Sequence, residues 1–220
     1  MVTRVKLCGL TSEADVALCA GAGADALGFV VEYPLPVPWT LDRRRAAELM
    51  RGAPPFATRV AVVGGDAATI LAIAEATMPD VLQLHLDEDE STVTAVKERL
   101  PGTQVVKAIR IRAGETPPAA EVTAAARRFV AAGADAILLD SKTEGRAAGT
   151  GIPVDWALAR DVAAALGAPL VLAGGLTPEN VGEAIRTVRP HAVDVISSVE
   201  DGEHRKVAAR VAAFVAAARS

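Results

Sequence analysis

The sequence has few of the residues that mark metal sites or disulfide-rich folds. Its 220 residues include two cysteines, Cys8 and Cys19, three histidines and only 3% aromatic side chains. Two cysteines without a C-x-x-C spacing do not make a disulfide framework, which favours a reducing, cytoplasmic setting. The histidines His85, His191 and His204 form no close pair with metal-ligand spacing. We therefore expect no metal site.

Long apolar runs and an excess of positive charge are also missing. No run reaches the ~18 apolar residues that a membrane-spanning helix requires. The chain starts almost directly with a predicted strand, without the basic and apolar regions of a signal peptide. A formal net charge of −4 gives no overall excess of positive charge that would bind nucleic acid or an anionic membrane. We therefore expect a soluble protein that binds neither.

What the sequence does contain is a regular alternation of short apolar runs and longer amphipathic ones. This pattern is typical of parallel strands joined by crossover helices. It predicts eight strands, at 4–8, 26–31, 58–63, 81–85, 104–110, 136–140, 170–173 and 193–197. It also predicts eight helices, at 12–22, 41–51, 67–77, 90–100, 118–132, 155–166, 178–188 and 204–218.

Strict alternation of eight strands with eight helices predicts an α/β fold, a single (β/α)8 barrel domain over residues 1–220. The competing architecture, an open doubly wound sheet, normally has fewer strands and a glycine-rich loop after the first one. The near-copies A-G-A-D-A-L at 22–27 and A-G-A-D-A-I at 132–137 fit repeated βα units. In such a barrel the chemistry lies at the C-terminal ends of the strands.

Two ionisable residues at predicted strand ends are candidates for acid and base. Cys8 ends the first strand and Asp140 ends the sixth, so closure of the barrel would bring a thiol and a carboxyl to one pocket. Cysteine acts as a base only as the thiolate, and aspartate acts as an acid only if burial raises its pKa. Such opposite demands are typical of paired acid and base roles. Taken singly, the cysteine fits a small buried hydrophobe and the aspartate a helix cap.

The segment A-G-G-L-T-P-E-N at 173–180 predicts a phosphate site. It reads as a strand end and two glycines, followed by Thr177 as N-cap and Pro178 as the first helical residue. Glycines let the backbone approach an anion, and the helix start offers free amides. The loops after the last two strands of such barrels frequently bind phosphate. The expected phosphate-binding residues are Gly174, Gly175, Ser197 and Ser198. The alternative is an ordinary tight turn with serine helix caps.

Together these stretches resemble the phosphoribosylanthranilate isomerase family of tryptophan biosynthesis, along almost the whole chain. The matching motifs are K-L-C-G-L-T at 6–11, A-D-A-L-G-F-V at 24–30, V-L-Q-L-H at 81–85, L-L-D-S at 138–141, G-T-G at 149–151 with D-W at 155–156, L-A-G-G-L-T-P-E-N-V at 172–181 and V-D-V at 193–195. The resemblance implies an Amadori rearrangement of an aminoaldose phosphate to an aminoketose phosphate, without metal or organic cofactor. It implies that Asp140 protonates the ribose ring oxygen and that Cys8 removes the proton from C2.

The resemblance also implies a small phosphosugar substrate and a G-T-G loop that closes over it. Asp194 is placed near the site on the eighth strand. The substrate contacts that we expect beyond the phosphate site are His85, Arg110, Asp194 and Trp39. A monomer or a homodimer is expected.

The chain departs from the family around the pocket. Family members usually carry S-P-R after the second strand, and its arginine grips the anthranilate carboxylate. Here Y-P-L-P-V-P-W-T occupies 33–40, with Pro38 or Trp39 in the arginine's place. Neither residue replaces a bidentate arginine clamp. A-V-V-G-G at 61–65 replaces the usual Phe and Asn, Leu86 replaces a glycine, and I-S-S at 196–198 replaces S-S-G.

Three interpretations stay open. The favoured one is a genuine anthranilate enzyme whose carboxylate contact comes from Arg43, Arg44, Arg110 or Arg112, because the phosphate frame and both catalytic positions are retained. The second is a paralogue that isomerises a phosphoribosylamine without that carboxylate. The third is a non-catalytic phosphosugar-binding barrel. The histidine positions disfavour a metal-dependent epimerase.

Overall fold

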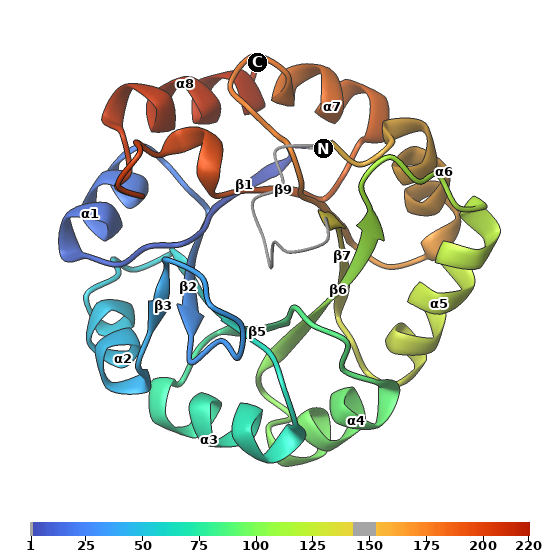
Figure 1. Ribbon diagram of the computed structural model, residues 1–220, viewed down its shortest axis with the longest axis horizontal. Helices are drawn as coiled ribbons and strands as arrows, with labels where there is room; N and C mark the ends of the chain where they lie inside the picture. Colours follow the sequence, from blue (N-terminus) through green and yellow to red (C-terminus); the bar gives the residue numbers. More distant parts are fainter. Residues whose placement is uncertain (1, 143–152) are drawn as a thin grey trace.

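The computed structural model describes residues 2–142 and 153–220 of the chain. Within them, eight parallel strands close into a barrel inside a ring of eight α-helices, which Figure 1 shows along the barrel axis. The predicted (β/α)8 fold is therefore confirmed. The expected G-T-G loop at 149–151 lies outside the described residues.

The barrel strands follow one another in chain order, and the last pairs with the first. They are β1 (Arg4–Leu7), β2 (Ala26–Val31), β4 (Thr58–Val63), β5 (Val81–Leu84), β6 (Gln104–Arg112), β7 (Ala136–Lys142), β8 (Leu170–Leu172) and β9 (Ala192–Val195). The bounds of β2 and β4 are the predicted ones, β9 differs from prediction at both ends, and the other strands differ by one or two residues at one end.

A ninth strand among the described residues, β3 (Thr40–Leu41), was not predicted. It pairs with the end of β2 through Val30 and Val31, outside the barrel wall proper. The predicted helix at 41–51 includes Leu41, which belongs instead to this strand. The two-residue strand is too short to show an apolar alternation in the sequence.

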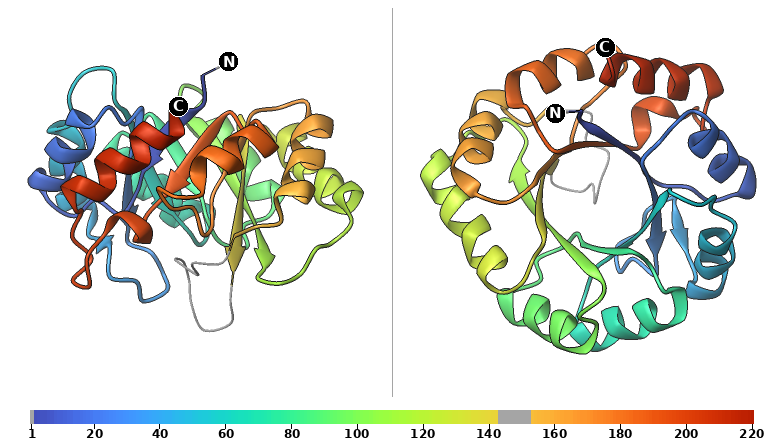
Figure 2. Two further views of the ribbon diagram at one scale, coloured as in Figure 1. Left: turned by 90° about the horizontal axis from the view of Figure 1, so that it is seen from above. Right: turned by 180° about the vertical axis from the view of Figure 1, so that it is seen from behind.

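The helices of the outer ring are α1 (Glu13–Gly21), α2 (Arg43–Arg51), α3 (Ala67–Thr77), α4 (Glu90–Arg99), α5 (Ala119–Ala131), α6 (Trp156–Leu166), α7 (Val181–Val188) and α8 (Ala208–Ala218). Aspartates Asp42, Asp66, Asp89 and Asp155 fix four helix starts by accepting a backbone amide hydrogen bond at the N-cap. Figure 2 shows from the side and from behind how this ring surrounds the strands, with α8 lying next to α1. None of the described helices is long and apolar enough to cross a membrane.

The starts of α7 and α8 were predicted too early by three and four residues, at 178 and 204, whereas the helices begin at Val181 and Ala208. The N-cap of α7 is Asn180 and not Thr177, because the helix begins at Val181. Thr177 caps the turn before the helix: its hydroxyl accepts from the Glu179 amide at 3.2 Å, and its own amide donates to the Asn180 side chain at 2.8 Å. The start of α8 is delayed because Glu200 and Lys206 form an antiparallel bridge, which holds the intervening residues out of a helix. Ser197 was predicted to end the last strand. It begins a short 3-10 helix, η1 (Ser197–Val199).

Alternation along the strands decides which side chains face the barrel interior. Ala108, Leu138, Val171 and Ala192 form an apolar cluster inside the barrel, whereas their sequence neighbours pack outward against the helices. The residue two positions further along each strand points the same way, toward the mouth. Arg110 therefore stands above Ala108, and Asp140 stands above Leu138, opposite Arg110 in the β6–β7 register.

Candidate active site

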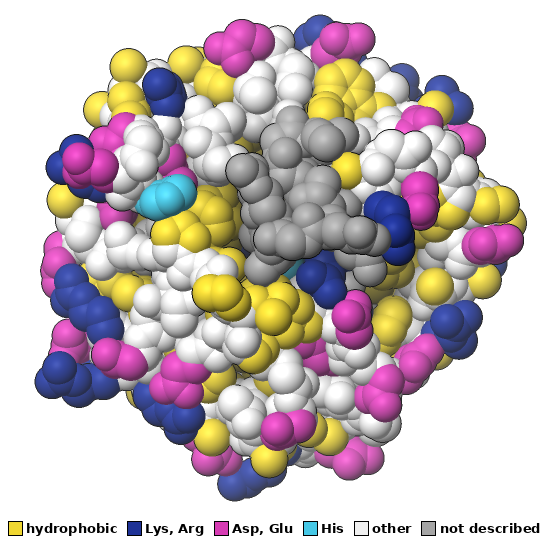
Figure 3. Space-filling view, in the orientation of Figure 1, with side chains coloured by type: hydrophobic (Ala, Val, Ile, Leu, Met, Phe, Trp, Pro, Cys, Tyr) yellow, Lys and Arg dark blue, Asp and Glu magenta, His cyan; other side chains and the backbone are white. Residues whose placement is uncertain are grey.

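A pocket opens at the C-terminal ends of the strands and holds about 670 Å³ of space, including its open mouth. Figure 3 looks onto this mouth and shows hydrophobic side chains on the side that lies over β2 and β3. The described residues that line the pocket are Cys8, Val30, Tyr33, Val37, Trp39, Val62, Gln83, His85, Asp140, Ala173, Gly174, Gly175, Leu176, Asp194, Val195, Ile196 and Ser197. No Lys or Arg is among them.

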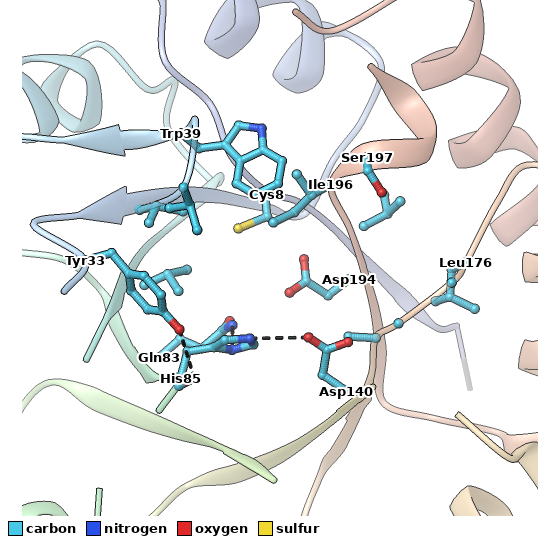
Figure 4. Close-up of a pocket in the computed structure, with 17 residues that line it drawn as sticks. Cys8, Tyr33, Trp39, Gln83, His85, Asp140, Leu176, Asp194, Ile196 and Ser197 are labelled. Carbon is cyan, nitrogen blue, oxygen red and sulfur yellow. Dashed lines mark hydrogen bonds and ion pairs between the residues drawn. The ribbon is translucent and has the colours of Figure 1, made fainter. Parts of the chain in front are cut away.

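The structure brings Cys8 and Asp140 to this one pocket, as the sequence predicted. Figure 4 shows the Cys8 sulfur and the Asp140 carboxyl pointing into it from opposite sides, with the Asp194 carboxyl between them. Cys8 has room for its thiol because Gly28 on β2 has no side chain. A Cβ at position 28 would lie 2.5 Å from the Cys8 sulfur.

An ion pair lies beneath the thiol. Lys6 and Asp194 are both buried, and the Lys6 Nζ donates a 2.7 Å hydrogen bond to Asp194 Oδ2. Burial raises the pKa of the Cys8 thiol, and the positive charge of Lys6 opposes that rise. Burial also disfavours the charge on Lys6, but Asp194 and Cys8 outweigh it and raise the pKa of Lys6. The thiol is therefore the resting form of Cys8, beside a cation able to stabilise the thiolate.

The second oxygen of Asp194 has no such partner. Asp194 Oδ1 is buried and makes no hydrogen bond within the described residues, although the residue lines the pocket. A buried carboxylate oxygen without a donor is costly, so a hydroxyl or amine of a ligand would satisfy it. This supports the predicted substrate contact of Asp194.

Asp140 is held by a short chain of hydrogen bonds. Gln83 Nε2 lies 3.0 Å from His85 Nδ1, and His85 Nε2 lies 3.3 Å from Asp140 Oδ2. If the Gln83 amide nitrogen donates to Nδ1, the proton of the neutral ring is on Nε2, facing Asp140. Asp140 Oδ1 accepts from the Ser141 amide at 2.8 Å. The carboxyl is thus fixed at both oxygens, with His85 lying in the pocket as predicted.

The predicted phosphate-binding residues gather at the β8 and β9 side of the pocket. Gly174 and Gly175 line it with positive φ angles of 82° and 61°, conformations that favour glycine. A Cβ on Gly174 would lie 2.9 Å from Asp140 Oδ1. Ser197 lines the pocket, but Ser198 donates its hydroxyl to the Leu176 carbonyl at 2.7 Å and so links the two loops.

Trp39 forms one wall of the pocket and is fixed from behind. Its indole Nε1 donates to Glu200 Oε2 at 3.1 Å, so its only polar group is used. Lys206 donates to Glu200 Oε1 and to the carbonyl oxygen of Cys8. Both charged side chains are almost fully buried. The network therefore ties the Trp39 wall to the backbone of the candidate base.

Tyr33 and Arg110, at the mouth of the barrel, each donate a hydrogen bond to a neighbouring residue. The Tyr33 hydroxyl donates to the His85 carbonyl at 3.1 Å. Arg110, predicted to contact substrate, does not line the pocket. Its Nη2 donates to Asp87 Oδ1 at 2.9 Å. Its Nε is buried without a partner among the described residues.

Sequence reasoning missed Lys6, Gln83, Glu200 and Lys206. Lys6 and Gln83 had a visible signal, because each precedes a predicted site residue by two positions on a strand and so faces the same way. Glu200 entered only as part of the family resemblance, after V-D-V at 193–195, and Lys206 had no signal, since it lies in a charged segment that is typical of a solvated loop. Within the described residues no group of three or more His, Cys, Asp and Glu side chains is arranged to hold a metal ion.

Comparison with known proteins identifies the family. The family model described as N-(5'phosphoribosyl)anthranilate (PRA) isomerase matches residues 5–217. The chain belongs to the PRA isomerase family. Among curated members, the Haloferax volcanii protein is 43% identical over 100% of this chain and 94% of its own length. The Pseudomonas aeruginosa protein is 42% identical over 99% of this chain and 95% of its own.

Solved PRA isomerases share the fold. The Thermotoga maritima enzyme has a TM-score of 0.81 at 32% identity, covering 99% of this chain and 98% of its own. A PRA isomerase in complex with reduced 1-(o-carboxyphenylamino)-1-deoxyribulose 5-phosphate also has a TM-score of 0.81, at 33% identity and with the same coverage. The predicted family resemblance is therefore confirmed.

Proposed function

We propose that this chain is an N-(5'-phosphoribosyl)anthranilate isomerase, which converts an aminoaldose phosphate to an aminoketose phosphate by acid and base catalysis. The observation that carries the proposal is the placement of Cys8 and Asp140 across one pocket beside the Gly174 and Gly175 turn. Membership of the family supports the same activity. The roles of the individual residues are part of this proposal.

The first chemical step is ring opening. Asp140 in its protonated form gives its proton to the ribose ring oxygen as the C1–O bond breaks, and the anomeric nitrogen forms a Schiff base with C1. Asp140 leaves this step as a carboxylate, which the His85 Nε2 and the Ser141 amide stabilise. The hydrogen bonds that hold Asp140 in place therefore favour the product of the step.

The second step is proton removal from C2. Cys8 acts as thiolate, takes the proton, and the electron pair of the C–H bond moves to give an enolamine that tautomerises to the ketone. The ammonium of Lys6, paired with Asp194 beneath the sulfur, stabilises the thiolate. Asp194 Oδ1 is free among the described residues to accept a hydroxyl hydrogen of the sugar.

The phosphate is held at the β8 and β9 side of the pocket. Among the described residues, the backbone amides of Gly175 and Ser197 are donors in no hydrogen bond. Two free amides and the Ser197 hydroxyl beside a glycine turn suit an anion. We assign the phosphate to Gly174, Gly175, Ser197 and the loop that Ser198 fixes.

Membership of the family also guides our proposals for the substrate class, cofactors, cellular setting and partners. We infer a small phosphosugar substrate, no organic or metal cofactor, a cytoplasmic setting and no nucleic-acid or membrane partner. The oligomeric state is monomer or homodimer, and a Thermotoga maritima relative is described as dimeric. A paralogue acting on a phosphoribosylamine whose aglycone lacks the carboxylate is the second candidate, favoured by the missing Lys and Arg in the described pocket lining.

Complementation tests the proposal in cells. Expression of the chain should restore growth without tryptophan to a bacterial strain that lacks its own isomerase. Cys8→Ala and Asp140→Asn variants, expressed at the same level, should not. Growth restored by both variants would remove the proposed catalytic roles, and failure of the parent chain to restore growth would favour the paralogue.

A further inference from the structure

The proposed substrate carries a second anion for which the described pocket lining supplies no cation. Anthranilate has a carboxylate beside its amine, yet the buried cation beneath Cys8, Lys6, is already paired with Asp194. A carboxylate taken out of water needs either a cationic partner or several hydrogen-bond donors. The cation must therefore come from a side chain next to the pocket.

Most arginines near the mouth are unsuited to this task. Arg43 makes a bidentate pair with Glu32 through its Nε and Nη2, at 2.8 and 2.6 Å. Arg44 is exposed on α2. Arg112 is 54% exposed and pairs with Glu115 at 3.3 Å. These three side chains are either saturated by a carboxylate or directed to solvent.

Arg110 differs from them in direction and burial. It continues the inward face of β6, above Ala108 and opposite Asp140. Its side chain is only 9% exposed, whereas its partner Asp87 is 85% exposed at the surface. The buried Nε makes no hydrogen bond among the described residues. A guanidinium with five donors is thus buried at the mouth with part of its fork unused.

Arg110 acts electrostatically on the side of the pocket that Tyr33 lines. Burial raises the pKa of the Tyr33 hydroxyl, and Arg110 is the foremost charge opposing that rise. Tyr33 and the apolar Val30, Val37, Val62 and Trp39 line this side. An aromatic ring lying there would have its ortho substituent within the field of Arg110.

We propose that Arg110 binds the carboxylate of the substrate's aromatic amine and so determines specificity for an anionic aglycone. The inference rests on the proposed isomerase function. The unused Nε and an Nη of the guanidinium can donate side by side to the two carboxylate oxygens, a bidentate geometry that lysine cannot reproduce. Asp87 competes for the same group from the surface, where its attraction is screened by solvent.

The test compares two substrates that differ only in the carboxylate. Phosphoribosylanthranilate and phosphoribosylaniline are prepared from ribose 5-phosphate, and kcat and KM are measured for both. Arg110→Gln should raise KM for the anthranilate substrate about 10-fold to 100-fold, the range expected for losing a hydrogen-bonded charge. The values for the aniline substrate should stay within about twofold, because that ring makes no ion pair. Arg110→Lys should lie between parent and Arg110→Gln.

Arg112→Gln is the matched control, since it removes an exposed arginine from the same strand. It should change neither substrate's KM. Equal effects of Arg110→Gln on both substrates, or no effect on either, would overturn the role of Arg110 while leaving isomerase activity in place. A parent enzyme that prefers the aniline substrate would also overturn it. A parent that turns over neither would instead remove the proposed function, and the inference with it.

Discussion

Lys6 and Asp194 face each other across the β1–β9 register and form a 2.7 Å ion pair beneath the thiol of Cys8. The pair is buried, and Lys6 is the main charge that opposes the effect of burial on the thiol. It gives the candidate base a fixed neighbouring cation that no ligand has to provide. The reactivity of Cys8 should therefore depend on Lys6.

The pH dependence of turnover follows from this pair. Because burial raises the pKa of Cys8, the thiolate fraction is small at neutral pH and grows as pH rises toward that raised pKa. We expect the limb of the kcat/KM profile that reports Cys8 to rise with pH, while the requirement for a protonated Asp140 gives a second limb that falls with pH. Lys6→Met removes the opposing charge, so the rising limb should move to higher pH and activity at neutral pH should fall.

The measurement is a pH profile of kcat/KM together with the ultraviolet absorbance of the thiolate, taken as a difference from Cys8→Ala. Cys19 does not interfere, because burial raises its pKa to about 12. Lys97→Met, which removes a more exposed lysine paired with Asp135, is the control and should leave the profile unchanged. A profile for Lys6→Met that matches the parent would contradict the account.

Gly28 leaves the space that the Cys8 thiol occupies, so adding one methyl group at position 28 should lower kcat. In Gly28→Ala the new Cβ would lie 2.5 Å from the Cys8 sulfur and 3.0 Å from Lys6 Nζ. We expect kcat to fall by at least about tenfold, because a misplaced base loses its reacting geometry. In Gly21→Ala nothing lies within 4 Å of the new Cβ, and kcat should not change. Similar kcat values for the two variants would show that the sulfur needs no such space.

Removing one member of the buried Glu200–Lys206 pair should destabilise the fold strongly, because it leaves the other charge buried without a counter-ion. Lys206→Met takes the donor from Glu200 Oε1 and from the Cys8 carbonyl, while Trp39 still donates to Glu200 Oε2. We expect the free energy of unfolding to fall by about 3–5 kcal/mol. Arg160→Met, which breaks an ion pair with both members 54% exposed, should cost less than about 1 kcal/mol. Urea unfolding of the two variants measures the difference, and equal midpoints would refute this ranking.

Much of the fold could be predicted because parallel barrel strands carry a strong apolar signal. The strand at 26–31 has the predicted bounds, since its side chains are buried toward the helices as well as toward the interior. The two-residue β3 and the bridge between Glu200 and Lys206 could not be predicted. Both are made by contacts between segments that have no periodic pattern of their own.

The same distinction applies to the site: residues at strand ends could be placed from the sequence, whereas contacts between distant segments could not. Cys8 and Asp140 could be placed in one pocket because Cys8 directly follows β1 and Asp140 lies near the end of β7, and all strand ends of a closed parallel barrel meet at one mouth. The network behind Trp39 could not, because it joins residues 161 positions apart in the chain. The family resemblance placed Trp39 at the pocket, but only the structure shows its hydrogen bond to Glu200. The individual site roles remain predictions.

The most direct test of the account is turnover of freshly prepared phosphoribosylanthranilate by the purified protein. We expect the parent to form the aminoketose phosphate, and Cys8→Ala and Asp140→Asn each to lose at least about 100-fold in kcat, as for removal of a general acid or base. Binding of reduced 1-(o-carboxyphenylamino)-1-deoxyribulose 5-phosphate should survive in both variants. Unimpaired turnover by either variant would contradict the account.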